Sequence, residues 1–106
     1  MESTLTRLVE WDRIPVGRGV FVPCQDKELA VFRLADPDRV FVIDNACPHS
    51  GGNLSGGQAC GTTVSCPVHQ WTFDLRSGLC VDSPKARVRV YRCEIRDGIV
   101  YADLGG

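Results

Sequence analysis

Two short boxes of metal-ligand residues stand out in this chain of 106 residues. The first box holds Cys47 and His49 with Pro48 between them, and the second holds Cys66 and His69. Sixteen residues separate His49 from Cys66. Thiolate and imidazole side chains bind transition metals in preference to hard cations. The pattern predicts one metal centre held by four side chains, two from each box.

Three kinds of centre could use this set of side chains. A structural zinc ion accepts two Cys and two His, but its usual spacing groups Cys with Cys and His with His, whereas each box here is mixed. A Cys–His nucleophilic pair needs one thiolate and one base, so a second box would be unnecessary. A [2Fe–2S] cluster with two Cys on one iron and two His on the other fits both the count and the pairing. We therefore expect the cluster and keep a zinc-binding structural or interaction module as the alternative.

Short alternating and β-branched runs around the boxes predict strands. The runs at 40–44 and 62–65 end just before the first and second box, so each box is expected to open a loop at a strand end. The tripeptide Arg96-Asp97-Gly98 between two apolar runs predicts a hairpin turn. Between 88 and 95 the apolar face changes phase near Val90, which a β-bulge would explain. We expect an all-β fold, a small antiparallel sandwich or barrel.

Length and composition are those of one small globular domain spanning 1–106. The chain is 43% hydrophobic and 24% charged, with a formal net charge of −1. This balance argues against a nucleic-acid partner, because such partners select a basic protein surface. Lys and Arg are scattered singly except between Lys85 and Arg92, where they alternate with apolar residues. That alternation predicts the exposed face of a strand.

The N-terminal segment Met1–Glu10 has no apolar core of signal-peptide length, and nowhere do 18 apolar residues run together. We therefore expect a cytoplasmic protein with no membrane partner. In a reducing compartment, clustered Cys and His more often bind metal than form disulfides. The Cys residues outside the boxes are expected to be small apolar or incidental residues, with Cys60 open to accidental oxidation; they are Cys24, Cys60, Cys80 and Cys93.

The two boxes, C-P-H-S-G-G and C-P-V-H-Q-W-T-F-D-L-R-S-G, closely resemble the double signature of Rieske ferredoxins. The stretch from the first box to the end of the second covers about a third of the chain. Outside it, "RIPVGRGV", "LAVFRL", "VFVIDNACPH" and "VRVYRCEIRDGIVY" are similar to the cluster-bearing small subunit of assimilatory NAD(P)H-dependent nitrite reductase. The stand-alone ferredoxins of aromatic-ring dioxygenases are the other relatives that the sequence resembles.

This resemblance implies a Rieske-like antiparallel β-sandwich with a small cluster-binding subdomain at about 45–75. It implies one [2Fe–2S] cluster, with Cys47, His49, Cys66 and His69 as its ligands. A second set of residues is expected to shape the surroundings of the cluster. Proline restricts the chain beside each Cys, glycine admits backbone amides, and a tryptophan shields the cluster from water. That set is Pro48, Gly51, Gly52, Pro67, Gln70 and Trp71, of which Gln70 departs from the glycine that relatives often have.

The ligand set also bears on the reduction potential. Two neutral imidazoles in place of two thiolates remove negative charge from the cluster, so an added electron is less opposed than in plant-type ferredoxins. High-potential relatives carry an additional Cys in each box, and these two form a disulfide. Neither Ser50-Gly51-Gly52 nor Gln70-Trp71 supplies such a Cys. We therefore expect a potential in the low part of the Rieske range.

The sequence shows no dinucleotide fingerprint and lacks the additional residues that a mononuclear iron oxygenase domain requires. We therefore expect a single-electron carrier that is not an enzyme on its own. Its partners are expected to be redox proteins. One possibility is the large flavin, iron–sulfur and sirohaem subunit of nitrite reductase, and the alternative is a flavin reductase with an aromatic-ring dioxygenase.

Overall fold

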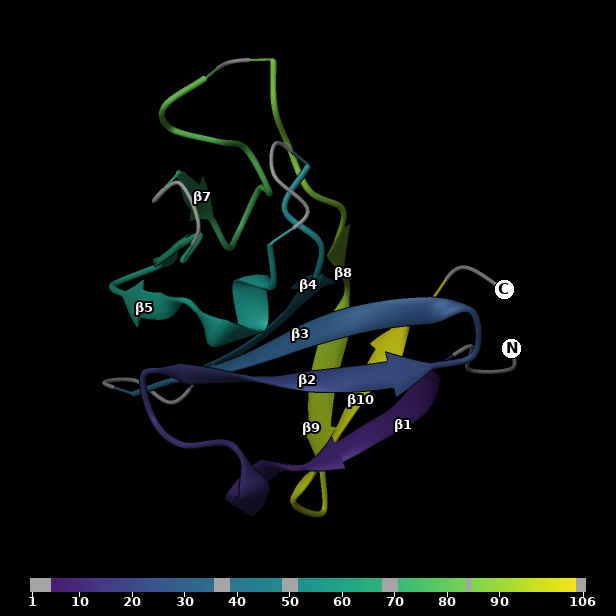
Figure 1. Cartoon of the computed structure of the whole chain (residues 1–106). Coiled ribbons are helices and arrows are strands. Elements are labelled where there is room, and N and C mark those ends of the chain that lie inside the picture. Colours follow the sequence, from purple (N-terminus) through teal and green to yellow (C-terminus); the bar gives the residue numbers. More distant parts are fainter. Residues whose placement is uncertain (1–4, 36–38, 49–51, 68–70, 84, 105–106) are drawn as a thin grey trace.

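The computed structural model describes residues 5–35, 39–48, 52–67, 71–83 and 85–104 (Figure 1). In these ranges β-strands dominate, and the only helices are two single-turn 3₁₀ segments, neither long and apolar enough to cross a membrane. The expectation of an all-β fold is confirmed. The elements in chain order are β1 (Leu5–Glu10), η1 (Trp11–Arg13), β2 (Arg18–Cys24), β3 (Lys27–Leu34), β4 (Arg39–Asp44), η2 (Leu54–Gly56), β5 (Gln58–Cys60), β6 (Thr63–Ser65), β7 (Thr72–Asp74), β8 (Val90–Tyr91), β9 (Cys93–Arg96) and β10 (Ile99–Asp103).

Antiparallel pairing joins the described strands into two sheets. The first has the order β1-β10-β9, and the second has the order β7-β6-β5-β2-β3-β4-β8. Within the second sheet, β2 and β5 are joined by the single pair Arg18 and Gln58. The strands β5, β6 and β7 therefore form a small ladder that is nearly separate from the long strands, and β7 lies at the far end of the molecule from the β9–β10 hairpin (Figure 1).

Strand β3 is buried on both faces. Successive side chains of a strand point to opposite sides, so neighbouring residues report on different faces. Leu29 and Val31 are fully buried on one face, and Ala30 and Phe32 are fully buried on the other. The first pair belongs to a lower core between the three-stranded sheet and the long strands of the second sheet: Ile14, Val22, Leu29, Val31, Val42, Tyr91, Val100, Ala102 and Leu104. The second pair belongs to an upper core shared with the small ladder: Ala30, Phe32, Leu34, Ile43, Cys47, Leu54, Val64, Cys66, Phe73, Leu75, Cys80 and Val88.

The predicted hairpin at Arg96-Asp97-Gly98 is confirmed. Arg96 pairs with Ile99, and both central residues take the left-handed conformation, with φ of 52° for Asp97 and 76° for Gly98. A turn with positive φ at both central positions matches the right-handed twist of the strands on either side. Glycine adopts this conformation without a steric penalty, whereas Asp97 is one of the few other residue types that tolerate it.

The change of phase between 88 and 95 has a different cause from the predicted bulge. Strand β8 pairs with β4 in regular register, and strand β9 pairs with β10 in the other sheet. The chain passes from one sheet to the other at Arg92. Val88 and Val90 therefore pack in or against the upper core, while Tyr91 and Cys93 pack in or against the lower core.

Strand β2 has weak sequence signals, because it contains Gly19 and Pro23, which disfavour the interior of a strand. The structure nevertheless pairs all of β2 with β3, from Arg18 opposite Arg33 to Cys24 opposite Lys27. Gly19 is required by a close approach: a Cβ atom there would lie 2.6 Å from Cε2 of Phe32. Packing against β3 thus overrides the local preference of this segment.

Candidate metal centre

Each Cys of the two boxes begins a loop that is closed by the same backbone hydrogen bond. The N–H of Cys47 donates to the carbonyl of Gly52 at 2.8 Å, and the N–H of Cys66 donates to the carbonyl of Trp71 at 2.7 Å. In both loops the acceptor lies five positions after the Cys. Strands β4 and β6 end shortly before Cys47 and directly before Cys66. The prediction that each box opens a loop at a strand end is confirmed.

The two cysteines are buried, and their loops lie side by side. Cys47 is 2% exposed and Cys66 is 0% exposed, and both belong to the upper core. Pro48 of the first loop and Trp71 of the second line one surface pocket of about 320 Å³. The structure thus brings the thiol-bearing ends of both boxes into one region, at the end of the molecule that carries β7 (Figure 1).

Part of the predicted site lies outside the described residues. Cys47, Pro48, Gly52, Cys66, Pro67 and Trp71 are described, whereas His49, Gly51, His69 and Gln70 are not. Among the described residues no three His, Cys, Asp or Glu side chains lie close enough to hold one metal ion. The assignment of the four ligands and of their neighbours therefore stays a prediction.

Asn45 organises the first loop, and the sequence pattern did not single it out. Its side chain is buried, with Nδ2 donating to Oδ1 of Asn53 at 2.8 Å and Oδ1 accepting from the N–H of Ser55 at 2.9 Å. Its backbone carbonyl accepts from the N–H of Leu54 at 2.8 Å. Because these bonds join residues on both sides of the first box, Asn45 fixes where the Cys47 loop begins and ends.

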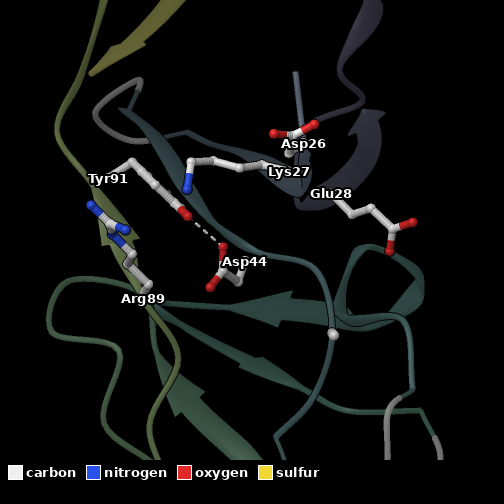
Figure 2. Close-up of a pocket in the computed structure, with 7 residues that line it drawn as sticks. Asp26, Lys27, Glu28, Asp44, Arg89 and Tyr91 are labelled. Carbon is white, nitrogen blue, oxygen red and sulfur yellow. Dashed lines mark hydrogen bonds between the residues drawn. The ribbon is translucent and has the colours of Figure 1, made fainter. Parts of the chain in front are cut away.

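Tyr91 fixes the end of β4 just before the first box. Its hydroxyl donates to Oδ1 of Asp44 at 2.5 Å, and its ring lies between the side chains of Lys27 and Arg89, whose charged groups are 5.6 Å and 5.0 Å from the ring centroid (Figure 2). Burial, followed by the hydrogen bond to Asp44, raises the pKa of Tyr91 to about 12. These residues line a mixed-charge pocket of about 410 Å³ beside Ala46.

The cysteines outside the boxes match the expectation of small apolar or incidental residues. Cys80 is buried in the upper core, while Cys24 and Cys93 are partly buried and pack against the lower core. Burial raises the pKa of the Cys93 thiol to about 11, so that thiol is unreactive at neutral pH. Cys60 is exposed, and none of the six cysteines forms a disulfide.

Comparison with known families identifies the class of this fold and site. Residues 4–103 match the family model of the Rieske-like [2Fe–2S] domain. The chain belongs to this family. Its cofactor is one Rieske-type [2Fe–2S] cluster, and the zinc alternative gives way to it. The two buried thiols on equivalent loops fit the Cys half of the ligand set that such a cluster requires.

Individual relatives come from several oxidoreductase systems. Cholesterol 7-desaturase of Drosophila melanogaster is 37% identical over 78 residues, which are 73% of this chain and 18% of the desaturase. The anthranilate 1,2-dioxygenase ferredoxin subunit of Burkholderia cepacia is 38% identical over 80 residues, which are 74% of this chain and 72% of that subunit. A solved structure described as an NADH-dependent nitrite reductase small subunit from Mycobacterium tuberculosis has 30% identity and a TM-score of 0.85, covering 92% of each chain. The chain thus spans less than a fifth of the desaturase but most of the two small proteins.

The structure predicts that Asn45→Ala destabilises the first loop. The substitution removes two side-chain hydrogen bonds and leaves the N–H of Ser55 without its acceptor, which costs about 2 kcal/mol of unfolding free energy. Urea unfolding measures this loss, and the decay of visible absorbance measures how fast the cluster is released. Asn53→Ala is the matched control, because it leaves the Asn45 bonds to Leu54 and Ser55 intact and should cost less. Equal losses in the two variants would contradict the role given to Asn45.

A second prediction concerns pH. Because the pKa of Tyr91 is raised to about 12, the folded state holds the phenolic proton more tightly than the unfolded state, whose tyrosines titrate near 10. The stabilisation is complete below the unfolded pKa and is lost as the pH rises from about 10 to about 12. Titration of the phenolate absorbance should show a late step that disappears in Tyr91→Phe and persists in Tyr101→Phe. A late step that survives in Tyr91→Phe would contradict this prediction.

Proposed function

We propose that this chain is a cytoplasmic single-electron carrier, the small electron-transfer subunit of an NAD(P)H-dependent nitrite reductase. The observation that carries the proposal is the pair of equivalent loops, each starting at a buried Cys and closed by the same backbone bond, in a Rieske-like domain. The similarity to the nitrite reductase small subunit, over 92% of both chains, supports this system. The six free cysteines are in keeping with a reducing compartment.

In this proposal the chain holds one cluster through Cys47, His49, Cys66 and His69. When bound, the cluster accepts and releases one electron. The contribution of the protein is to hold the ligands in place while the charge of the cluster changes. The two loop-closing bonds fix the backbone of Cys47 and Cys66, and the upper core keeps water from both thiols. The loops then need little rearrangement during electron transfer.

A second candidate function is the ferredoxin component of an aromatic-ring dioxygenase system. The 38% identity with the anthranilate 1,2-dioxygenase ferredoxin subunit favours it. In that role the same cluster would carry electrons between a flavin reductase and the oxygenase. Both candidates use the same site and differ only in the redox partner.

Reconstitution with purified partners distinguishes the two candidates. The chain is added to a large nitrite reductase subunit with NAD(P)H and nitrite, and separately to a flavin reductase and a dioxygenase with NADH and an aromatic substrate. We expect the chain to increase the rate of nitrite consumption and to co-purify with the large subunit. Stimulation of the dioxygenase alone would overturn the nitrite reductase assignment and favour the ferredoxin role.

Metal analysis tests the site independently of the partner. We expect two iron atoms and two acid-labile sulfides per chain after anaerobic purification, a coloured protein and an EPR signal in the reduced state. A colourless protein with one zinc ion and no sulfide would contradict the electron-carrier proposal as a whole.

The reduction potential is a further prediction. Rieske centres lie at roughly −150 to +300 mV, and we expect this chain in the low part of that range because neither box supplies an additional Cys. The N–H groups of Cys47 and Cys66 already donate to the carbonyls of Gly52 and Trp71, so these two donors do not stabilise negative charge on the cluster. A redox titration followed by visible absorbance measures the potential. A value near the top of the range would contradict the expectation.

A further inference from the structure

The strongest unassigned feature is a row of cations beside the two Cys loops. Between residues 83 and 93 the chain has four cations and no carboxylate. Lys85, Arg87 and Arg89 are exposed, and Ala86 and Val88 between them pack in or against the upper core. We call Lys85, Arg87 and Arg89 the basic row. The exposure expected for these cations is confirmed, but the expected strand is wrong for the row itself, because the regular strand β8 begins only at Val90. Neither the fold nor the cluster explains the charge of the row.

Backbone hydrogen bonds fix the orientation of this row. The N–H of Val88 donates to the carbonyl of Gly78 at 2.8 Å, and the carbonyl of Ala86 accepts from the N–H of Cys80 at 3.1 Å. The carbonyl of Arg89 accepts from the N–H of Asp44 at 3.0 Å. Because the inward side chains are held in the core, the cations must face solvent. The basic row is therefore a fixed feature of the surface.

Two members of the row, Lys85 and Arg87, lie beside the two Cys loops. Lys85 and Arg87 line the same pocket as Pro48 and Trp71, one residue from each Cys loop. Val81, which is 64% exposed, lies next to the residue that follows Trp71, because its N–H donates to the carbonyl of Thr72 at 2.8 Å. This surface therefore combines apolar and charged side chains, as protein interfaces do.

The charge of Lys85 and Arg87 is not neutralised by any ion pair within the described ranges. The salt bridges there are Arg7–Glu10, Arg13–Glu10, Arg76–Asp74 and Arg96–Glu94. Asp82 is the nearest carboxylate in the sequence, and its Oδ2 accepts from the N–H of Thr72 at 2.7 Å. Arg89 differs from the other two, since it stacks on Tyr91, which is bonded to Asp44.

We propose that Lys85 and Arg87, with Pro48 and Trp71, form a docking surface for a redox partner protein that presents carboxylates around its own electron site. The chain has a net charge of −1, so its overall charge would not attract such a partner. A local positive patch attracts such a partner in spite of the net charge, and it orients the partner with its carboxylates over the cluster loops. This inference rests on the proposed electron-carrier function.

Small redox probes test the inference without knowledge of the partner. The protein is reduced, and its oxidation is followed by stopped-flow absorbance with ferricyanide or with tris(phenanthroline)cobalt(III). Each probe takes one electron from the cluster: ferricyanide becomes ferrocyanide, and the cobalt complex becomes cobalt(II). At low salt we expect the double variant Lys85→Glu, Arg87→Glu to react about tenfold more slowly with ferricyanide and faster with the cobalt complex. Added salt should shrink both effects.

The matched control is the double variant Arg13→Glu, Arg96→Glu. It changes the net charge by the same amount at η1 and at the β9–β10 hairpin, which lie at the opposite end of the molecule from β7 (Figure 1). We expect its rates with both probes to stay within twofold of the wild type. Equal effects in the two double variants would overturn the proposal, because net charge alone would then explain the rates.

A third variant and the partner assay complete the test. The charge-reversed protein could fail to hold its cluster, so Lys85→Gln with Arg87→Gln serves as a milder variant. We expect it to be oxidised by ferricyanide several-fold more slowly than the wild type. An unchanged rate in this variant would overturn the proposal. In whichever partner system the reconstitution assay selects, we expect Lys85→Glu with Arg87→Glu to raise the KM for the carrier about tenfold and to leave kcat unchanged. A wild-type protein without a cluster would refute the proposed function, whereas a cluster-bearing protein with no charge selectivity would refute only the docking surface.

Discussion

Replacing Cys66 with serine should remove the visible absorption of the protein and the EPR signal of its reduced form. The reason is that Cys66 is fully buried at the start of the second loop and is predicted to bind one iron through its thiolate. Serine is smaller and is a far weaker ligand for iron. We expect nearly complete loss of iron and sulfide, measured by metal analysis and visible spectroscopy after anaerobic purification.

Cys60→Ser is the matched control for this substitution. Cys60 is exposed on β5 in the same part of the molecule, so the chemical change is identical but no ligand is lost. We expect a full cluster content and an unchanged spectrum. His69→Ala should resemble Cys66→Ser, since it removes a predicted ligand from the same loop. An unchanged spectrum in Cys66→Ser or His69→Ala would refute the assignment of that ligand.

Gly57→Ala should lower the free energy of unfolding by about 2–3 kcal/mol. Gly57 lies between η2 and β5, and a Cβ atom there would be 2.0 Å from the backbone carbonyl oxygen of Ser65. Its φ of −79° is an ordinary value, so the effect is a steric clash with backbone and not a change in backbone preference. The clash can be relieved only by moving β5 away from β6. Urea unfolding of the cluster-bearing protein measures the loss.

The adjacent glycine provides the control. A Cβ atom at Gly56 would have no atom within 4 Å, so Gly56→Ala should change the unfolding free energy by less than about 0.5 kcal/mol. Because Ser65 directly precedes Cys66, we also expect Gly57→Ala to release its cluster faster than Gly56→Ala. If both variants are equally stable and hold the cluster equally well, the contact between Gly57 and Ser65 does not position the second loop.

The contrast between these two glycines shows which parts of the site the sequence could not predict. Both lie in one glycine-rich segment, and neither the residue type nor the spacing distinguishes them. The difference arises because β5 pairs with β6, so that Gly57 meets the carbonyl of Ser65. Asn45 is a similar case, since its side chain is positioned by hydrogen bonds to Asn53 and Ser55, which follow the first box in the chain. Local sequence patterns carry no information about such contacts.

The strands also fall into two groups: those that local sequence patterns predict and those that depend on contacts between distant segments. Strands β4 and β6 and the β9–β10 hairpin were predicted, because alternation, β-branched residues and turn chemistry are local signals. Strand β2 has a poor local pattern and becomes a strand only through its pairing with β3. The change of phase near Val90 was visible in the sequence. Its cause, the passage from one sheet to the other at Arg92, was not.

The sequence by itself predicted the chemistry of the centre, since the mixed pairs Cys47 with His49 and Cys66 with His69 favour a [2Fe–2S] cluster over zinc. The family match confirms the cluster, while the four ligands stay a prediction. The sequence also determined that each box opens a loop at a strand end. Only the tertiary structure decided that both loops close by the same hydrogen bond, that their thiols share one core, and that Lys85 and Arg87 lie beside them. The physical reason is the separation along the chain of the residues involved. Ligand type and strand period are properties of neighbouring residues, whereas burial and juxtaposition depend on segments that meet only when the chain folds.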